Sequence, residues 1–164
     1  MRTRILAFWL SGLLPIATSA QSAEPAATPP RNEVELAKAA LHQAADQAFV
    51  SSWSEVSRRS SQSGVTAHRF RLAGRWSVMA YNLGACSDLA SPQLVAEWRA
   101  AFDNIDLGAT DASNKFRRDF QQQAFRGLDE GQADNPFANQ AAPKARLCGA
   151  MLAAIAEEVA DLRQ

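Results

Sequence analysis

The residues with the most reactive side chains are two cysteines, Cys86 and Cys148, the only ones among 164 residues. A thiol becomes a nucleophile when a helix N-terminus or neighbouring cations stabilise its thiolate. Cys86 instead follows the expected end of a helix, where the helix dipole is negative, and Asp88 lies two residues further on. Catalysis by Cys86 is therefore disfavoured, and no catalytic residue is predicted.

The two histidines offer a second kind of chemistry. His42 and Asp46 are four residues apart, so they can share a helix face, and His68 could complete a transition-metal site with them. Surface or half-buried histidines are the simpler interpretation. The chain also lacks the motifs for haem attachment, phosphate loops, dinucleotide binding, zinc proteases and serine hydrolases. We therefore predict no metal site and no cofactor.

The acidic residues give no stronger site. Residues 103–108 resemble a calcium loop only weakly, because Ile105 and Leu107 stand where oxygen ligands are needed. Glycosidase-type catalysis needs two carboxylates across a cleft. The acidic pairs are expected on solvated faces instead; they are Asp103/Asp106, Asp129/Glu130 and Glu157/Glu158.

A weak candidate for a binding surface comes from Tyr81, Asn82, Trp76 and Trp98. Tyr81 and Asn82 are polar and lie close to Cys86 in the sequence, which makes them the better pair. The tryptophans could line a groove. Aromatic side chains are also the largest contributors to a small core, and that interpretation is favoured for each tryptophan.

The N-terminus has the pattern of a secretory signal peptide. Arg2 and Arg4 precede an apolar segment, Ile5–Ala17, and small residues follow at Thr18–Ala20. We predict cleavage near Ala20, export to the periplasm or the medium, and no transmembrane segment in the mature chain. Residues 21–31 are rich in alanine and proline and are predicted to form a flexible leader.

Export also decides how the cysteines are interpreted. An even number of cysteines in an oxidising compartment is typical of disulfides. We predict a Cys86–Cys148 bridge that closes a loop of about 60 residues and stabilises the fold by roughly 4 kcal/mol.

Periodic apolar residues predict an all-α fold, a small bundle of about five helices in one domain from residue 32 to 164. Gly84 is expected just past the end of the second helix, in a left-handed conformation. A short strand at 65–72 is the alternative for the start of that helix. The predicted helices are 32–56, 66–83, 92–108, 111–131 and 143–162, with a polar loop at 57–64 and a polar connection at 129–142.

Charge and composition limit the functional classes. The 17 basic residues balance the 17 acidic ones, so the concentrated positive charge of a nucleic-acid-binding face is not expected. The leading hypothesis is an exported, non-enzymatic interaction protein whose partner is another envelope or secreted protein, such as an inhibitor, immunity protein, chaperone or accessory subunit. The alternatives are a small-molecule or metal carrier, and an enzyme whose site would combine Tyr81, Asn82, Asp88 and a histidine.

Overall fold

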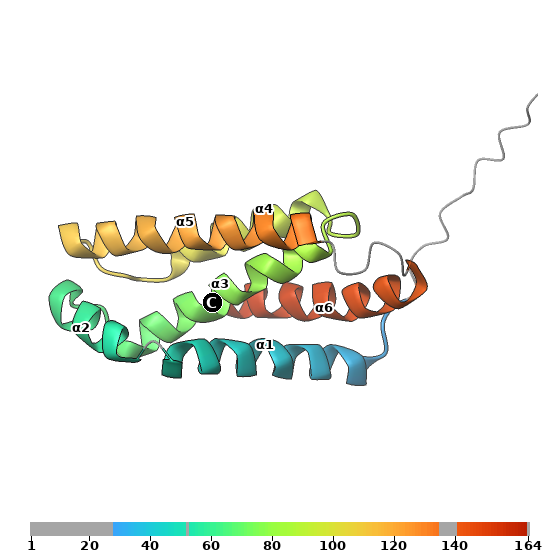
Figure 1. Cartoon of the computed structure of the whole chain (residues 1–164), viewed down its shortest axis with the longest axis horizontal. Helices are drawn as coiled ribbons and strands as arrows, with labels where there is room; N and C mark the ends of the chain where they lie inside the picture. Colours follow the sequence, from blue (N-terminus) through green and yellow to red (C-terminus); the bar gives the residue numbers. More distant parts are fainter. Residues whose placement is uncertain (1–27, 52, 135–140, 164) are drawn as a thin grey trace, which may run out of the picture.

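The computed structural model describes residues 28–51, 53–134 and 141–163. Over these ranges the chain is all-α, as predicted, with six α-helices, one 3-10 turn and no strand (Figure 1). The elements are α1 (Arg31–Ser51), α2 (Trp53–Ser63), α3 (Ala67–Ala85), α4 (Pro92–Ala101), η1 (Phe102–Asn104), α5 (Asp111–Asp134) and α6 (Ala141–Leu162).

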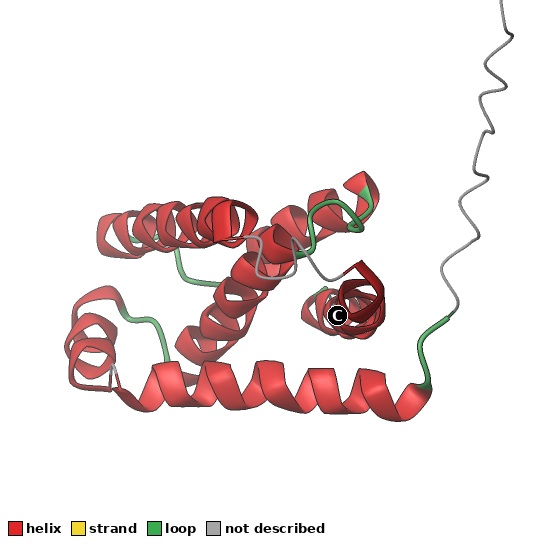
Figure 2. Ribbon diagram, turned by 45° about the vertical axis from the view of Figure 1, so that its right-hand side comes forward, coloured by secondary structure: helices red, strands yellow, loops and turns green. Residues whose placement is uncertain are grey.

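Helix α3 crosses the middle of the molecule obliquely, with α5 on one side and α1 and α6 on the other (Figure 1 and Figure 2). Thr66 caps α3, since its side chain accepts a hydrogen bond from the Arg69 backbone N–H. The strand considered for residues 65–72 is therefore not formed. The contact between α3 and α5 is the most extensive of all helix pairs.

Two glycines allow α3 and α5 to approach so closely. A Cβ atom on Gly84 would lie 2.0 Å from the backbone oxygen of Leu128. A Cβ atom on Gly131 would lie 2.1 Å from the backbone oxygen of Tyr81. The prediction of a left-handed Gly84 past the helix end was wrong: α3 continues through it to Ala85, and the glycine serves the helix crossing. Gly131, predicted to close the fourth helix, lies inside α5 for the same reason.

Residues 57–63 are helical, so the predicted polar loop at 57–64 was wrong. Glu55 pairs with Arg58 and Arg59 at helical spacing, and α2 packs against α3 and α5. Gly64 ends the helix with φ 71°, a left-handed conformation that glycine adopts without strain. Short-range ion pairs and tertiary packing thus outweigh the weak helix propensity of the serines.

Trp76 and Trp98 lie in the core and not on a surface. Both are fully buried, and their rings stack with centroids 4.7 Å apart and planes 6° apart. Each indole N–H donates to the backbone oxygen of the other residue, at 2.6 Å and 3.0 Å. The pair fixes α4 to α3 and satisfies both buried donors. Ser91 caps α4, and the helix predicted for 92–108 ends at Ala101, where η1 follows.

Glu158 is 1% exposed, so the expected solvated face at Glu157/Glu158 was wrong for this residue. Its carboxylate lies 2.7 Å from Arg75 Nη2 and 2.7 Å from His42 Nε2, with Lys38 Nζ at 3.4 Å. The three partners come from α1 and α3. The buried carboxylate, with two cations and the His42 imidazole as partners, therefore ties α6 to both helices.

Candidate functional site

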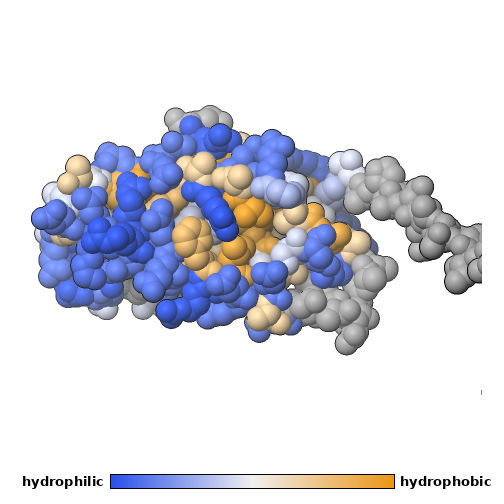
Figure 3. All heavy atoms as spheres, turned by 90° about the horizontal axis from the view of Figure 1, so that it is seen from above, coloured by the Kyte–Doolittle hydropathy of each residue, from blue (hydrophilic) through white to orange (hydrophobic). Residues whose placement is uncertain are grey.

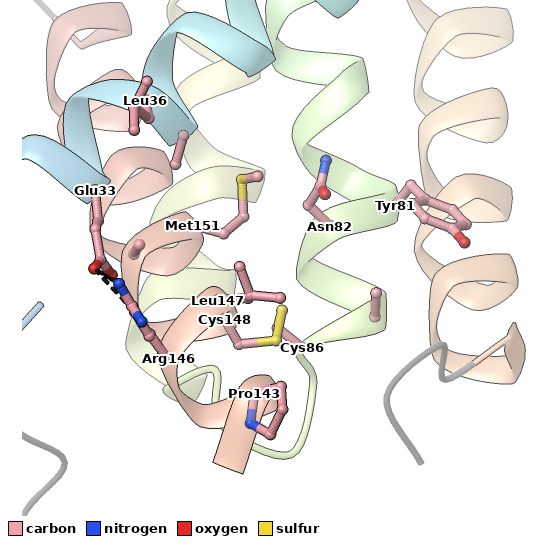
Figure 4. A pocket seen from close by; sticks show the side chains of 13 residues that line it. Glu33, Leu36, Tyr81, Asn82, Cys86, Pro143, Arg146, Leu147, Cys148 and Met151 are labelled. Atoms are coloured by element: carbon pink, nitrogen blue, oxygen red, sulfur yellow. Dashed lines mark hydrogen bonds and ion pairs between the residues drawn. A yellow bond between two sulfur atoms is a disulfide. The ribbon is translucent and has the colours of Figure 1, made fainter. Parts of the chain in front are cut away.

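An open groove of about 960 Å³ lies between α1, the C-terminal part of α3 and the N-terminal part of α6 (Figure 4). Its lining is almost entirely apolar. We call it the α1–α3–α6 groove. The described residues that line it are Glu33, Leu36, Ala37, Tyr81, Asn82, Ala85, Cys86, Pro143, Arg146, Leu147, Cys148, Ala150 and Met151.

The predicted disulfide is present and forms part of this lining. The Cα atoms of Cys86 and Cys148 are 5.5 Å apart, and both residues are buried. Cys86 follows α3 directly, and its backbone N–H donates to the Asn82 backbone oxygen at 3.0 Å. Cys148 lies on the buried face of α6. The bridge therefore holds the end of α3 against α6 and fixes the width of the groove (Figure 4).

The charged groups of the groove neutralise each other. Arg146 Nε donates to Glu33 Oε1 at 2.9 Å, which joins α6 to α1 at one edge (Figure 4). This hydrogen bond lowers the pKa of the Glu33 carboxyl below its ordinary value and raises that of Arg146. Both groups are therefore ionised near neutral pH, and together they add no net charge to the groove.

Tyr81 and Asn82, the two polar residues singled out from the sequence, both line the groove. The Tyr81 hydroxyl donates to Asp134 on α5 at 3.0 Å, and this hydrogen bond raises the pKa of the phenol. Asn82 Nδ2 donates to the Val78 backbone oxygen at 3.1 Å. Trp76 and Trp98, the other two candidates, are in the core and do not reach it.

The sequence analysis did not identify the two exposed apolar residues that line the groove. Leu36 and Leu147 line it, yet they are 69% and 54% exposed. Leu147 immediately precedes the buried stripe that starts at Cys148, and Leu36 lies off the stripe of α1. The signal that the sequence offered for a binding surface was that both are large apolar residues outside a buried helical stripe.

The groups considered for metal binding or catalysis lie elsewhere. His42 contacts Glu158, and His68 is exposed near the start of α3. Within the described ranges, no three His, Cys, Asp or Glu side chains are placed to hold a metal ion. Asp88 pairs with Lys144 at 2.6 Å, and neither Asp88 nor a histidine is among the lining residues of the groove. None of the described helices is both long and apolar enough to cross a bilayer.

A second apolar area lies on another face. Helices α4 and α5 are uppermost in Figure 1, and Figure 3, seen from above, shows hydrophobic atoms gathered among hydrophilic ones. A shallow hollow of about 710 Å³ between these helices is lined by Val95 and Phe125, among others. Arg99 covers the Phe125 ring at 5.6 Å. This cation partly shields the apolar area, unlike the exposed leucines of the α1–α3–α6 groove.

Comparison of the chain with protein-family models, curated proteins and solved structures finds no match in any of the three. The fold and the site define a small all-α protein, pinned by one disulfide and carrying an apolar groove.

Proposed function

We propose that this protein is an exported, non-enzymatic interaction protein that binds an apolar segment of another envelope or secreted protein in the α1–α3–α6 groove. The disulfide and the signal-peptide pattern support export. The observation that carries the proposal is the pair of exposed leucines, Leu36 and Leu147, at the edges of an apolar groove.

The dimensions of the groove favour a short protein segment. Its lining residues on α6 run from Pro143 to Met151, which at a rise of 1.5 Å per residue is about 12 Å. About two turns of a helix cover that length and present two or three apolar side chains. A partner protein also extends beyond the groove, so it covers Leu36 and Leu147 more fully than a small ligand inside would.

The charge distribution sets the character of that segment. Glu33 and Arg146 neutralise each other, and the rest of the lining is almost entirely apolar. A charged group placed in the groove would lose its hydration without gaining a partner. The binding face of the partner is therefore uncharged, with large aliphatic or aromatic anchors.

The test is capture of partners from the native envelope, with the full chain exported by its own N-terminus and tagged at its C-terminus. Leu36→Glu and Leu147→Glu each place a charge at the groove. Val50→Glu is the matched control, because Val50 is on the same helix as Leu36, is 67% exposed and does not line the groove.

We expect one stoichiometric protein on the wild type and on Val50→Glu, reduced at least tenfold on both groove variants. The proposal fails if no stoichiometric protein is captured. It also fails if the groove variants retain the partner, or if Val50→Glu loses it as they do.

A second candidate function is transport of a small apolar molecule in the same groove. The volume, about 960 Å³, is at the upper end of the range for small-molecule sites, about 300–1,000 Å³. Native mass spectrometry of protein purified without detergent would then show added mass. A protein that is always empty, and whose melting temperature does not respond to lauric acid, would contradict this function.

A further inference from the structure

We propose that a cavity lined by residues of α1, α2, α3 and α5 binds a small, uncharged, planar aromatic molecule of one or two rings. This cavity is separate from the α1–α3–α6 groove and has a volume of about 400 Å³. It is within the range of small-molecule sites, and it is larger than the roughly 150 Å³ apolar cavity that holds a benzene molecule.

Four phenylalanines form the walls of this cavity. Phe70 and Phe116 are buried, with ring centroids 4.4 Å apart and planes inclined by 60°. Phe120 lies 5.1 Å from Phe116 at 46°, and Phe49 closes the side formed by α1. Rings inclined in this way present both edges and faces, so a further flat ring can make edge-to-face or offset contacts with them.

Gly74 provides the space for that ring. It lies within α3 and lines the cavity, and a Cβ atom built on it would meet no other atom within 4 Å. Its φ is not positive, unlike those of Gly64 and Gly108. A glycine inside a helix costs about 1 kcal/mol relative to alanine. Neither backbone conformation nor packing requires glycine here, and the missing side chain leaves the helix backbone accessible to a flat ligand in the cavity.

The polar groups at the rim determine the charge of the ligand. Arg59 on α2 pairs with Glu55, and its Nη1 is 3.9 Å from Asp119 on α5. Glu55 is also bonded by Arg58, and Asp119 by Lys115. Each of these ions therefore has an oppositely charged partner at the rim, so none is left unpaired for a charged ligand. An uncharged ring therefore fits the cavity best.

The test uses indole as the probe and the full-length oxidised protein. Indole is titrated while backbone amide resonances are followed by two-dimensional NMR. We expect saturable shifts centred on residues 70–78 of α3 and 116–123 of α5. Gly74→Val fills the space beside the helix and should weaken indole binding at least tenfold. Gly149→Ala is the control, because Gly149 is also a helical glycine with no atom within 4 Å of a built Cβ and lines neither cavity.

Gly74→Ala separates binding from folding. It should raise the melting temperature of the free protein, because alanine favours the helix, and Gly149→Ala should do the same. The proposal is supported if indole binding saturates and is weakened at least tenfold by Gly74→Val, in a protein no less stable than wild type. It is overturned if indole does not saturate the wild type, if the shifts centre on the α1–α3–α6 groove, or if the loss with Gly74→Val stays below tenfold. These results are independent of partner capture by the groove.

Discussion

Replacing each of four helical glycines by alanine should change stability in opposite directions, although the chemical change is the same. A built Cβ meets nothing within 4 Å at Gly74 and Gly149. At Gly84 and Gly131 it would lie 2.0 Å and 2.1 Å from a backbone oxygen. Alanine restricts the unfolded chain at all four positions to a similar extent, so the difference arises in the folded state.

The magnitudes follow from these distances. At Gly74 and Gly149 we expect the free energy of unfolding to rise by about 0.5–1 kcal/mol, the usual gain in helix propensity. At the α3–α5 crossing an ordinary contact needs at least 3.4 Å, so the helices must move apart by more than 1 Å. Overpacking costs about 1–3 kcal/mol, and contacts along the crossing are lost in addition. After the gain in helix propensity is subtracted, we expect Gly84→Ala and Gly131→Ala each to lower the free energy of unfolding by about 2 kcal/mol.

The assay is urea denaturation of the oxidised protein at neutral pH, with midpoint and slope measured for each variant. One separation of α3 from α5 relieves both clashes, so the double variant Gly84→Ala/Gly131→Ala should lose clearly less than the sum of the single losses. Equal stability of wild type and both crossing variants would refute the close approach of these helices. If Gly74→Ala or Gly149→Ala lowered the free energy of unfolding as much as the crossing variants do, the space around the added Cβ atom would not determine the effect of alanine.

Three further predictions concern ionic groups and the disulfide. Glu158→Leu should lower the free energy of unfolding by about 2–4 kcal/mol in urea denaturation, because it leaves Arg75 without its carboxylate partner. The loss is smaller than for a fully buried pair, since Arg75 is partly hydrated. A loss below about 1 kcal/mol would contradict this prediction. Replacing both Cys86 and Cys148 by alanine should lower the free energy of unfolding by about 4 kcal/mol. A melting temperature equal to that of the wild type would contradict this prediction. The hydrogen bond from Lys144 lowers the pKa of Asp88 below 3.8, so the pair adds stability above that pH and loses it as the pH falls through the lowered pKa. Urea midpoints between pH 6 and pH 2 should therefore fall less for Asp88→Asn than for wild type, and parallel curves would disprove the coupling.

The general fold could be predicted from the sequence because apolar periodicity and disulfide pairing are strong, local signals. Cys148 lies on a regular stripe of α6, and Cys86 follows a helix that has a well-defined end. Helix α2 could not be predicted in the same way, because its serines disfavour a helix and only packing on α3 and α5 compensates. Gly84 was misassigned because a glycine at a helix end and a glycine at a helix crossing look alike in one sequence.

The candidate sites depend on which residues of distant helices meet, and a single sequence does not contain that information. Tyr81 and Asn82 were found because polar residues beside a cystine suggest a shaped surface. The sequence marks Leu36 and Leu147 only as apolar residues outside a buried stripe, and that they share a groove follows from the placement of α1 beside α6. Glu158 looked like a solvated residue because its cationic partners lie on α1 and α3, more than 80 positions earlier in the chain.

The position of the bridge also sets the order in which parts of the molecule open. Cys86–Cys148 makes a covalent ring that contains α4 and α5, whereas α1, α2 and α3 lie outside it. Of these three helices, α3 is held by its extensive contact with α5, and α1 and α2 have fewer contacts to hold them. Local opening then starts with α1 and α2, and the ring opens only with the whole molecule. Amide hydrogens of α2 should exchange with solvent first and those of α3 last. A brief release of α1 removes one wall of the groove, while the cystine in the groove stays in place.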